Sequence, residues 1–167
     1  MAIDSGTLQS WAKYNNGPIK SAKRTHTRIQ NELQTNDRLS NIDFNTFLQG
    51  SYANSTIVRA SSDVDIVVRL KEMYYADLSG LDEYERDEWR RSSGDPGYSW
   101  QKFRSDVVDV LEERFGASAV DPLGKAIEVD TSKLPLNADV LVCANHRAYY
   151  NYPNGSVEIL CVQHYLR

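Results

Sequence analysis

Two aspartates at the head of an apolar run are the feature that most restricts how this chain can fold. In the stretch FLQGSYANSTIVRASSDVDIVV, Asp63 and Asp65 stand just before an apolar run that starts at Ile66. A β-branched run of this kind predicts a buried strand. A buried strand excludes carboxylates unless their charge is paired or bound to a metal. The fold must therefore bring this end of the strand to a place where both charges are neutralised.

The spacing of the two aspartates predicts that they share one face of the strand. Side chains at positions i and i+2 point the same way, so Asp63 and Asp65 project together, while Val64 and Ile66 point to the packed side. Adjacent carboxylates repel each other at neutral pH, so at least one is expected to have a raised pKa when no cation lies between them. Magnesium suits the pair because it prefers oxygen ligands and is often held by a few carboxylates together with substrate phosphates. Manganese is the alternative ion.

A third carboxylate is expected from a neighbouring strand. In the segment LNADVLVCA, Asp139 opens another apolar run and lies between Ala138 and Val140. Asp130, in IEVDTS, is the alternative, but it ends its strand beside a threonine and a serine and is more typical of a turn or cap. Three carboxylates on adjacent strands of one sheet could hold two metal ions. Two metals activate an attacking hydroxyl and stabilise a pyrophosphate leaving group.

A turn of small residues precedes the aspartates. Gly50 and Ser51 follow the short apolar segment FNTFLQ. Glycine lets the backbone approach a phosphate closely, and a serine hydroxyl and the free amides of a turn can donate hydrogen bonds to phosphate oxygens. The turn and the carboxylates together indicate a site for a phosphorylated ligand and its metal ions.

The remaining pattern predicts a single α+β domain over residues 1–167. We expect helices over 18–36 and 100–116, strands over 44–48, 64–70, 125–129 and 138–142, and a hairpin around the PNG turn at 153–155. The charged segment 77–97, which contains glycines and a proline, is expected to be a loop or a mobile insertion. The hairpin tyrosines Tyr149, Tyr150 and Tyr152 fit either stacking on a base or packing on the sheet. Runs of strands with few helices between them favour a mixed, mostly antiparallel sheet with its helices packed on one face.

Composition limits the partners and the compartment. The net charge of −4 argues against nucleic-acid binding, since domains that grip a duplex are usually basic. Lys20, Arg24 and Arg28 form a basic stripe on the first helix, for which a solvated face is favoured over a nucleic-acid contact. No apolar run approaches the length of a membrane span, and the N-terminus lacks the blocks of a signal peptide. Without a CxxC pair a zinc site is not expected, and Cys143 and Cys161 are interpreted as buried thiols of a cytoplasmic protein.

The site residues together resemble a known signature. Gly50-Ser51, eleven intervening residues, Asp63-Val64-Asp65 and the later Asp139 resemble the polymerase-β-like nucleotidyltransferases. The longer segment QGSYANSTIVRASSDVDIVV, with its preceding helix, is more specifically similar to the bacterial relatives of cyclic GMP-AMP synthase and oligoadenylate synthase. These are the CD-NTases, which make cyclic di- or trinucleotide messengers in anti-phage defence. The resemblance extends over roughly residues 15–152.

This resemblance implies a reaction and a set of site residues. The reaction transfers a nucleoside monophosphate from a nucleoside triphosphate to a hydroxyl and releases pyrophosphate, with a cyclic oligonucleotide as the final product. Asp139 would also help to activate the incoming hydroxyl. The implied residues are the magnesium-binding Asp63, Asp65 and Asp139, Gly50 and Ser51 for the donor triphosphate, and Gln49 as a contact near the donor nucleotide.

The chain departs from the family in its length. CD-NTases are about twice as long, and the helical C-terminal half that closes their nucleotide cleft is absent from residues 1–167. A missing C-terminal half or an activating partner protein would complete such an enzyme. Two alternatives stay open: a stand-alone nucleotidyltransferase that modifies a protein or a small molecule, and a truncated, inactive fragment that binds nucleotide.

Overall fold

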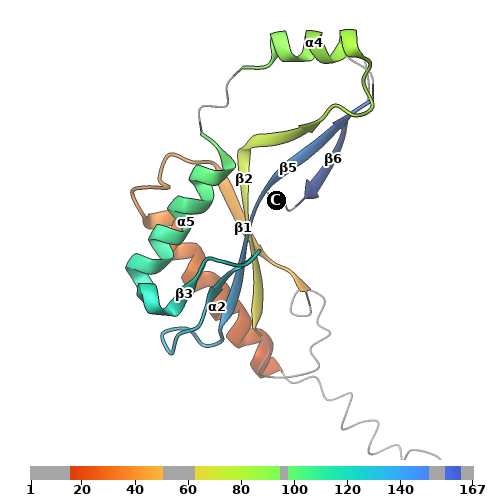
Figure 1. Ribbon diagram of the computed structural model, residues 1–167. Helices are drawn as coiled ribbons and strands as arrows, with labels where there is room; N and C mark the ends of the chain where they lie inside the picture. Colours follow the sequence, from red (N-terminus) through yellow and green to blue (C-terminus); the bar gives the residue numbers. More distant parts are fainter. Residues whose placement is uncertain (1–15, 51–62, 95–97, 151–156, 163–167) are drawn as a thin grey trace, which may run out of the picture.

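The computed structural model describes residues 16–50, 63–94, 98–150 and 157–162. The elements follow in the order α2 (Asn16–Thr35), β1 (Phe44–Leu48), β2 (Val64–Asp77), α4 (Glu83–Ser92), α5 (Trp100–Phe115), the short 3-10 helix η1 (Ala117–Ala119), β3 (Val120–Asp121), β4 (Ile127–Val129), β5 (Ala138–Tyr149) and β6 (Val157–Val162). Figure 1 shows these elements coloured along the sequence.

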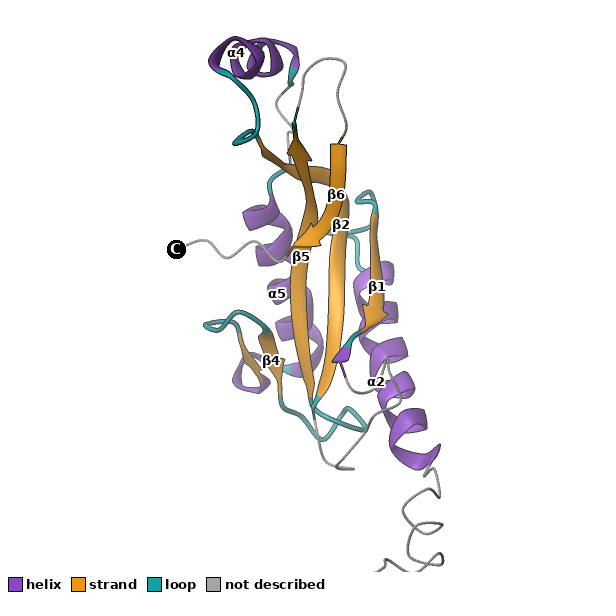
Figure 2. Cartoon of the chain, turned by 90° about the vertical axis from the view of Figure 1, so that its right-hand side faces the viewer, coloured by secondary structure: helices purple, strands orange, loops and turns teal. Residues whose placement is uncertain are grey.

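A single sheet forms the centre of the fold. Its strands lie in the order β1-β2-β5-β4-β3, and β6 also pairs with β5. Only the β2–β5 pair is parallel among the described strands, and the other four pairs are antiparallel. Figure 2 shows the two long strands β2 and β5 side by side, with α2 and α5 on one side of them. The predicted α+β class, with a mostly antiparallel sheet and helices on one face, is confirmed.

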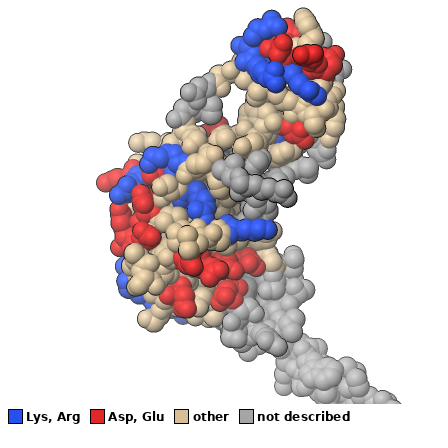
Figure 3. Space-filling model, viewed as in Figure 1, with Lys and Arg blue, Asp and Glu red and all other residues tan. Residues whose placement is uncertain are grey.

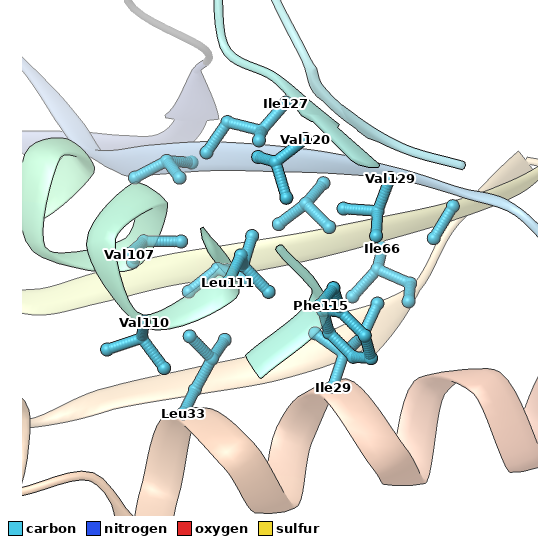
Figure 4. Close-up of a cluster of buried hydrophobic side chains, with 14 of the residues drawn as sticks. Ile29, Leu33, Ile66, Val107, Val110, Leu111, Phe115, Val120, Ile127 and Val129 are labelled. Atoms are coloured by element: carbon cyan, nitrogen blue, oxygen red, sulfur yellow. The ribbon is translucent and has the colours of Figure 1, made fainter. Parts of the chain in front are cut away.

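The core lies between this face of the sheet and the two helices. In α2, Ala22, Ile29 and Leu33 recur at helical spacing and are fully buried. They meet buried residues of α5 such as Val107 and Leu111, and Figure 4 shows these side chains packed together beneath the strands. Burying an aliphatic side chain of this size stabilises a fold by about 1.5–3 kcal/mol. This packing fixes the strands on which the candidate site is built.

The two central strands alternate between the core and the opposite face. In β2, Val64 and Ile66 are fully buried against the helices, and in β5 Ala138 and Val140 take the same position. Side chains between them must point to the other face, because successive side chains of a strand alternate. The helix-free face therefore receives the residues at 65 and 139.

The segment expected to be a loop contains a helix, so that prediction is wrong over Glu83–Ser92. Asp82 caps α4, and the side chain of Glu85 bonds back to the Asp82 N–H in a capping box. None of its residues is buried, which explains the missing apolar stripe. The ring of Trp89 packs edge-on against the ring of Tyr149, with 6.0 Å between the ring centroids. Figure 1 places α4 at the far end of β2 and β5, away from α2 and α5, and Figure 3 shows both acidic and basic side chains there.

Several smaller expectations can be compared with the structure. The β5–β6 hairpin is present, and its turn lies outside the described residues. Tyr149 is buried and its hydroxyl donates to that of Tyr74, Tyr150 is half exposed, and Tyr152 lies outside the described residues. Cys143 is buried, as predicted, whereas the side chain of Cys161 is not described. In the described part of the chain, no helix is both long and apolar enough to cross a membrane.

Candidate active site

The parallel pairing of β2 with β5 brings two of the predicted carboxylates together. Asp65 and Asp139 are direct partners in the register. Both point to the helix-free face, and both are half-buried. The N–H of Val64 donates to the carbonyl of Asn137 at 2.9 Å, which fixes the start of β2 against β5. Asp63 precedes this point and is exposed.

The end of β1 lies directly against the Asp65 carboxylate. The N–H of Gln49 donates to the backbone carbonyl of Asp65 at 2.9 Å. Gly50 follows with a φ of +68°, and a Cβ at this position would lie 2.2 Å from Oδ2 of Asp65. Only glycine accommodates both the left-handed backbone and the close approach. The predicted small-residue turn thus begins beside a site carboxylate, while Ser51 lies outside the described residues.

The carboxylates perturb one another electrostatically. Partial burial, and next the charge of Asp63, raise the pKa of Asp65 above its ordinary value. Partial burial also raises the pKa of Asp139, with further contributions from Asp63, Asp65 and Glu128. The expectation of a raised pKa in the absence of a cation is confirmed. Like charges held this close favour the binding of a cation between them.

The donor set fits a hard cation. Within the described residues, none of the three aspartates forms an ion pair with lysine or arginine. The described side chains also include no group of three or more histidine, cysteine, aspartate or glutamate residues placed to hold a metal ion. Magnesium and manganese take oxygen ligands, and magnesium usually keeps waters and binds substrate phosphates as well as one or two carboxylates. A row of carboxylates beside a turn therefore suits these ions without a protein cage.

Sequence reasoning missed two acidic residues on this face: Glu128, and Asp121, which pairs with Glu128 from β3 and is also exposed. The antiparallel pairing of β4 with β5 places Glu128 in register with Asp139. Ile127 and Val129 are buried, so the exposed Glu128 projects from the helix-free face. Glu128, Asp139 and Asp65 thus form an acidic row across three adjacent strands. Figure 3 shows acidic side chains gathered over β3 and β4.

Asp130, the alternative third carboxylate, lies just beyond β4 and is exposed. Its backbone N–H donates to the carbonyl of Ala119 at 3.0 Å. It has no partner in β5 among the described pairs, in contrast to Asp139. The structure therefore brings Asp139, and not Asp130, beside Asp65.

Two hollows lined by described residues lie away from the acidic row. One, of about 270 Å³, is lined by residues including Lys23, Arg24 and Pro135 beside α2, and its basic side chains are exposed, as expected of a solvated helix face. The other, of about 330 Å³, is lined by residues including Trp100 and Arg104 beside α5. Neither of these two hollows includes a residue of the acidic row.

Comparison with known proteins assigns this arrangement to a family. The family model described as "Nucleotidyltransferase domain" matches residues 27–152. The chain belongs to the nucleotidyltransferase family. The match includes every residue of the acidic row and the turn at Gly50.

The relatives of this nucleotidyltransferase are cyclic nucleotide synthases. It is 33% identical over 159 residues to the cyclic nucleotide synthase CdnE01 of Staphylococcus haemolyticus, covering 93% of this chain and 51% of that protein. It is 36% identical over 151 residues to the cyclic UMP-AMP synthase of Rhodothermus marinus, covering 89% of this chain and 48% of that protein.

A solved structure extends the comparison to the fold. The Rhodothermus marinus CdnE c-UMP-AMP synthase with Apcpp and Upnpp superposes with a TM-score of 0.71 and 32% identity, over 93% of this chain and 49% of that chain. The nucleotidyltransferase thus spans about half the length of the curated relatives it matches. The resemblance to the CD-NTases is confirmed.

Proposed function

We propose that this nucleotidyltransferase moves a nucleoside monophosphate from a nucleoside triphosphate to a hydroxyl in a magnesium- or manganese-dependent reaction. The observation that carries this proposal is the register of Asp65 with Asp139, directly beside Gly50. It puts a candidate phosphate-binding turn and two carboxylates within one short stretch of surface. In the transfer, the hydroxyl loses its proton, its oxygen bonds to the α-phosphorus, and the bond from this phosphorus to pyrophosphate breaks.

Each site residue has a task in this reaction. Asp63, Asp65 and Asp139 hold the metal ions and so orient the two substrates. Bound magnesium supplies charge stabilisation for the leaving pyrophosphate and lowers the pKa of the attacking hydroxyl. Asp139 faces the incoming hydroxyl. The donor nucleotide is held by Gly50 and Ser51 at its triphosphate and by Gln49 nearby.

The product we propose is a cyclic oligonucleotide that acts as a second messenger in anti-phage defence. Support comes from the relatives, which include a cyclic UMP-AMP synthase and the cyclic nucleotide synthase CdnE01. A C-terminal half or an activating partner protein would cover the acidic row. A cytoplasmic location would supply the nucleoside triphosphates that such a reaction consumes and the magnesium that it requires.

The test uses the full-length protein with radiolabelled nucleoside triphosphates and magnesium or manganese. We expect a phosphatase-resistant product from wild type, its loss in Asp65→Asn and Asp139→Asn, and its retention in Asp37→Asn. Asp37 is an exposed aspartate remote from the row and serves as the matched control. No product from any nucleotide mixture, or full activity in Asp139→Asn, would refute the proposal.

The same reactions distinguish the two alternative functions. A mass gain equal to one nucleotide on a partner protein or small molecule would identify a stand-alone modifying enzyme. Magnesium-dependent binding of a non-hydrolysable nucleoside triphosphate without any turnover would identify an inactive nucleotide-binding fragment. Both outcomes keep the aspartate site and change only what the site acts on.

A further inference from the structure

Glu128 is a carboxylate at the candidate site that the proposed reaction has not yet used. It lies in register with Asp139, which lies in register with Asp65. Among the described residues, the side chain of Glu128 forms no ion pair with lysine or arginine. Like charges directly opposite each other on neighbouring strands destabilise a sheet. The position of Glu128 therefore lowers the stability of the sheet, and this cost favours a role for Glu128 in the reaction.

The order of groups along the acidic row predicts from which side the acceptor hydroxyl approaches. Gly50 abuts Asp65 from the β1 side, and Glu128 stands at the opposite end of the row, beyond Asp139. In phosphoryl transfer the attacking and leaving oxygens lie roughly in line, on opposite sides of the phosphorus. If the donor triphosphate is held at Gly50, pyrophosphate leaves toward β1. The attacking hydroxyl must then arrive from the other end, past Asp139 and over β4.

We propose that Glu128 binds the acceptor nucleotide beside Asp139. This inference rests on the proposed transferase function and adds the recognition of the second substrate. An ionised carboxylate only accepts hydrogen bonds, so Glu128 selects acceptors that present an O–H or N–H group to β4. On a nucleotide these are the ribose hydroxyl that is not being joined and the ring or amino N–H groups of the base. The negative charge of Glu128 also repels the phosphates of the acceptor, so these are expected to point away from β4.

The test separates donor and acceptor by chemistry. A radiolabelled 2′,3′-dideoxynucleoside triphosphate can only donate, because it has no sugar hydroxyl to attack with. An α,β-methylene ribonucleoside triphosphate can only accept, because its α-phosphorus cannot lose pyrophosphate. Formation of the linear first product by the full-length protein is measured as the acceptor concentration is varied. Donor affinity is measured separately, as the KM for the dideoxy donor at a saturating concentration of the acceptor.

Three variants are compared with wild type. In Glu128→Ala we expect the KM for the acceptor to rise about tenfold or more, because a hydrogen bond to a charged group is lost. In Glu128→Gln the rise should be smaller, since the amide oxygen still accepts. For both variants, kcat and donor affinity should stay within about twofold of wild type. The hydrogen bond to residue 128 forms when the acceptor binds and persists during attack, so its loss weakens the bound state and the transition state equally. Glu83→Ala, an exposed carboxylate on α4 at the far end of the sheet, should change nothing.

Acceptor analogues identify the bonded group. A deoxynucleotide acceptor tests the sugar, and a purine acceptor without its amino group tests the base. The analogue that lacks the bonded group should raise KM in wild type and cause no further rise in Glu128→Ala. An unchanged acceptor KM in Glu128→Ala, or a loss that falls on donor affinity instead, would overturn the inference while leaving the transferase intact. Wild type that transfers to no acceptor would refute the proposed function itself, and this inference with it.

Discussion

Alanine at Gly50 would test whether the end of β1 touches the Asp65 carboxylate. Gly50 has a φ of +68°, and an added Cβ would lie 2.2 Å from Oδ2 and 3.2 Å from Cγ of Asp65. Two other glycines provide matched controls. Gly116 also has a positive φ, of +100°, but a Cβ there meets nothing within 4 Å, and at Gly94 a Cβ likewise meets nothing within 4 Å. The three alanine substitutions therefore separate backbone strain from collision.

The expected losses follow from this geometry. A sparsely populated backbone conformation with positive φ costs a non-glycine residue about 1–3 kcal/mol, so Gly116→Ala, at φ 100° and ψ 140°, should lower the free energy of unfolding by about that amount. Gly94→Ala should be neutral or slightly stabilising. Gly50→Ala carries the same strain and must also push the carboxylate aside, because Cβ atoms essentially never come within 3.0 Å of another heavy atom. Overpacking of this kind adds about 1–3 kcal/mol.

A double-mutant cycle with Asp65→Ala isolates the collision. Without the carboxylate, the nearest atom to the new Cβ is the Cβ of residue 65 at 3.7 Å, an ordinary contact. Gly50→Ala should then cost only its backbone strain, and the cycle should show a coupling of about 1 kcal/mol or more. The free energies come from urea unfolding. Equal costs in both backgrounds, within about 0.5 kcal/mol, would show that the contact does not exist and that the site is built differently.

Further predictions concern charge. Without metal, Asp65→Asn should keep or slightly raise the melting temperature, and it should lose the rise in melting temperature that magnesium is expected to give wild type. If the mutant instead unfolds badly and magnesium shifts neither protein, the aspartates are structural partners of a basic group. Because the pKa of Asp65 is raised in the fold, its contribution to stability is full below the unfolded value of about 4 and is lost as pH rises through the folded value. The stability gain of Asp65→Asn over metal-free wild type should therefore grow between pH 4 and pH 7, and urea unfolding at both values measures it. Asp106 is buried, which opposes ionisation, but hydrogen bonds from Lys102 and Tyr98 lower its pKa overall. Its stabilisation is therefore present above about pH 4 and is lost as pH falls through its folded pKa. Asp106→Asn should thus cost about 1–3 kcal/mol at pH 7 and much less in acid, and a variant equally destabilised at both pH values would contradict this assignment.

Local patterns predicted the elements that pack against the core. The helices expected over 18–36 and 100–116 occur as Asn16–Thr35 and Trp100–Phe115. Their apolar periodicity is produced by the same burial that stabilises them, so the sequence carries the signal directly. The faces of β2 and β5 were equally readable, since each aspartate stands between residues that are buried in the fold.

Features set by distant contacts were harder to predict. The helix Glu83–Ser92 has a capping box as a sequence signal, D-x-x-E, but it lacks an apolar stripe because it buries nothing. β2 continues to Asp77 beyond its apolar run, past a register shift between Leu70 and Tyr74. Glu128 was missed because its place beside Asp139 depends on the β4–β5 register, which no local pattern encodes. The roles of all the proposed site residues stay predictions: Gln49, Gly50, Ser51, Asp63, Asp65 and Asp139.

The parallel pairing of β2 with β5 also makes the acidic row a late product of folding. A hairpin such as β5–β6 closes a short loop, whereas parallel strands need a long crossover, here the whole segment from α4 to β4. The entropy of closing this loop is lost before the contacts across it can repay the loss. A chain with α2 and α5 formed but β2 and β5 unpaired keeps Asp65 and Asp139 apart, with no mutual repulsion and no shared affinity for a cation. In the proposed enzyme, metal and nucleotide would therefore stabilise only the completed fold, and their binding would report that β2 and β5 have paired, the strand pairing most distant in sequence among the described residues.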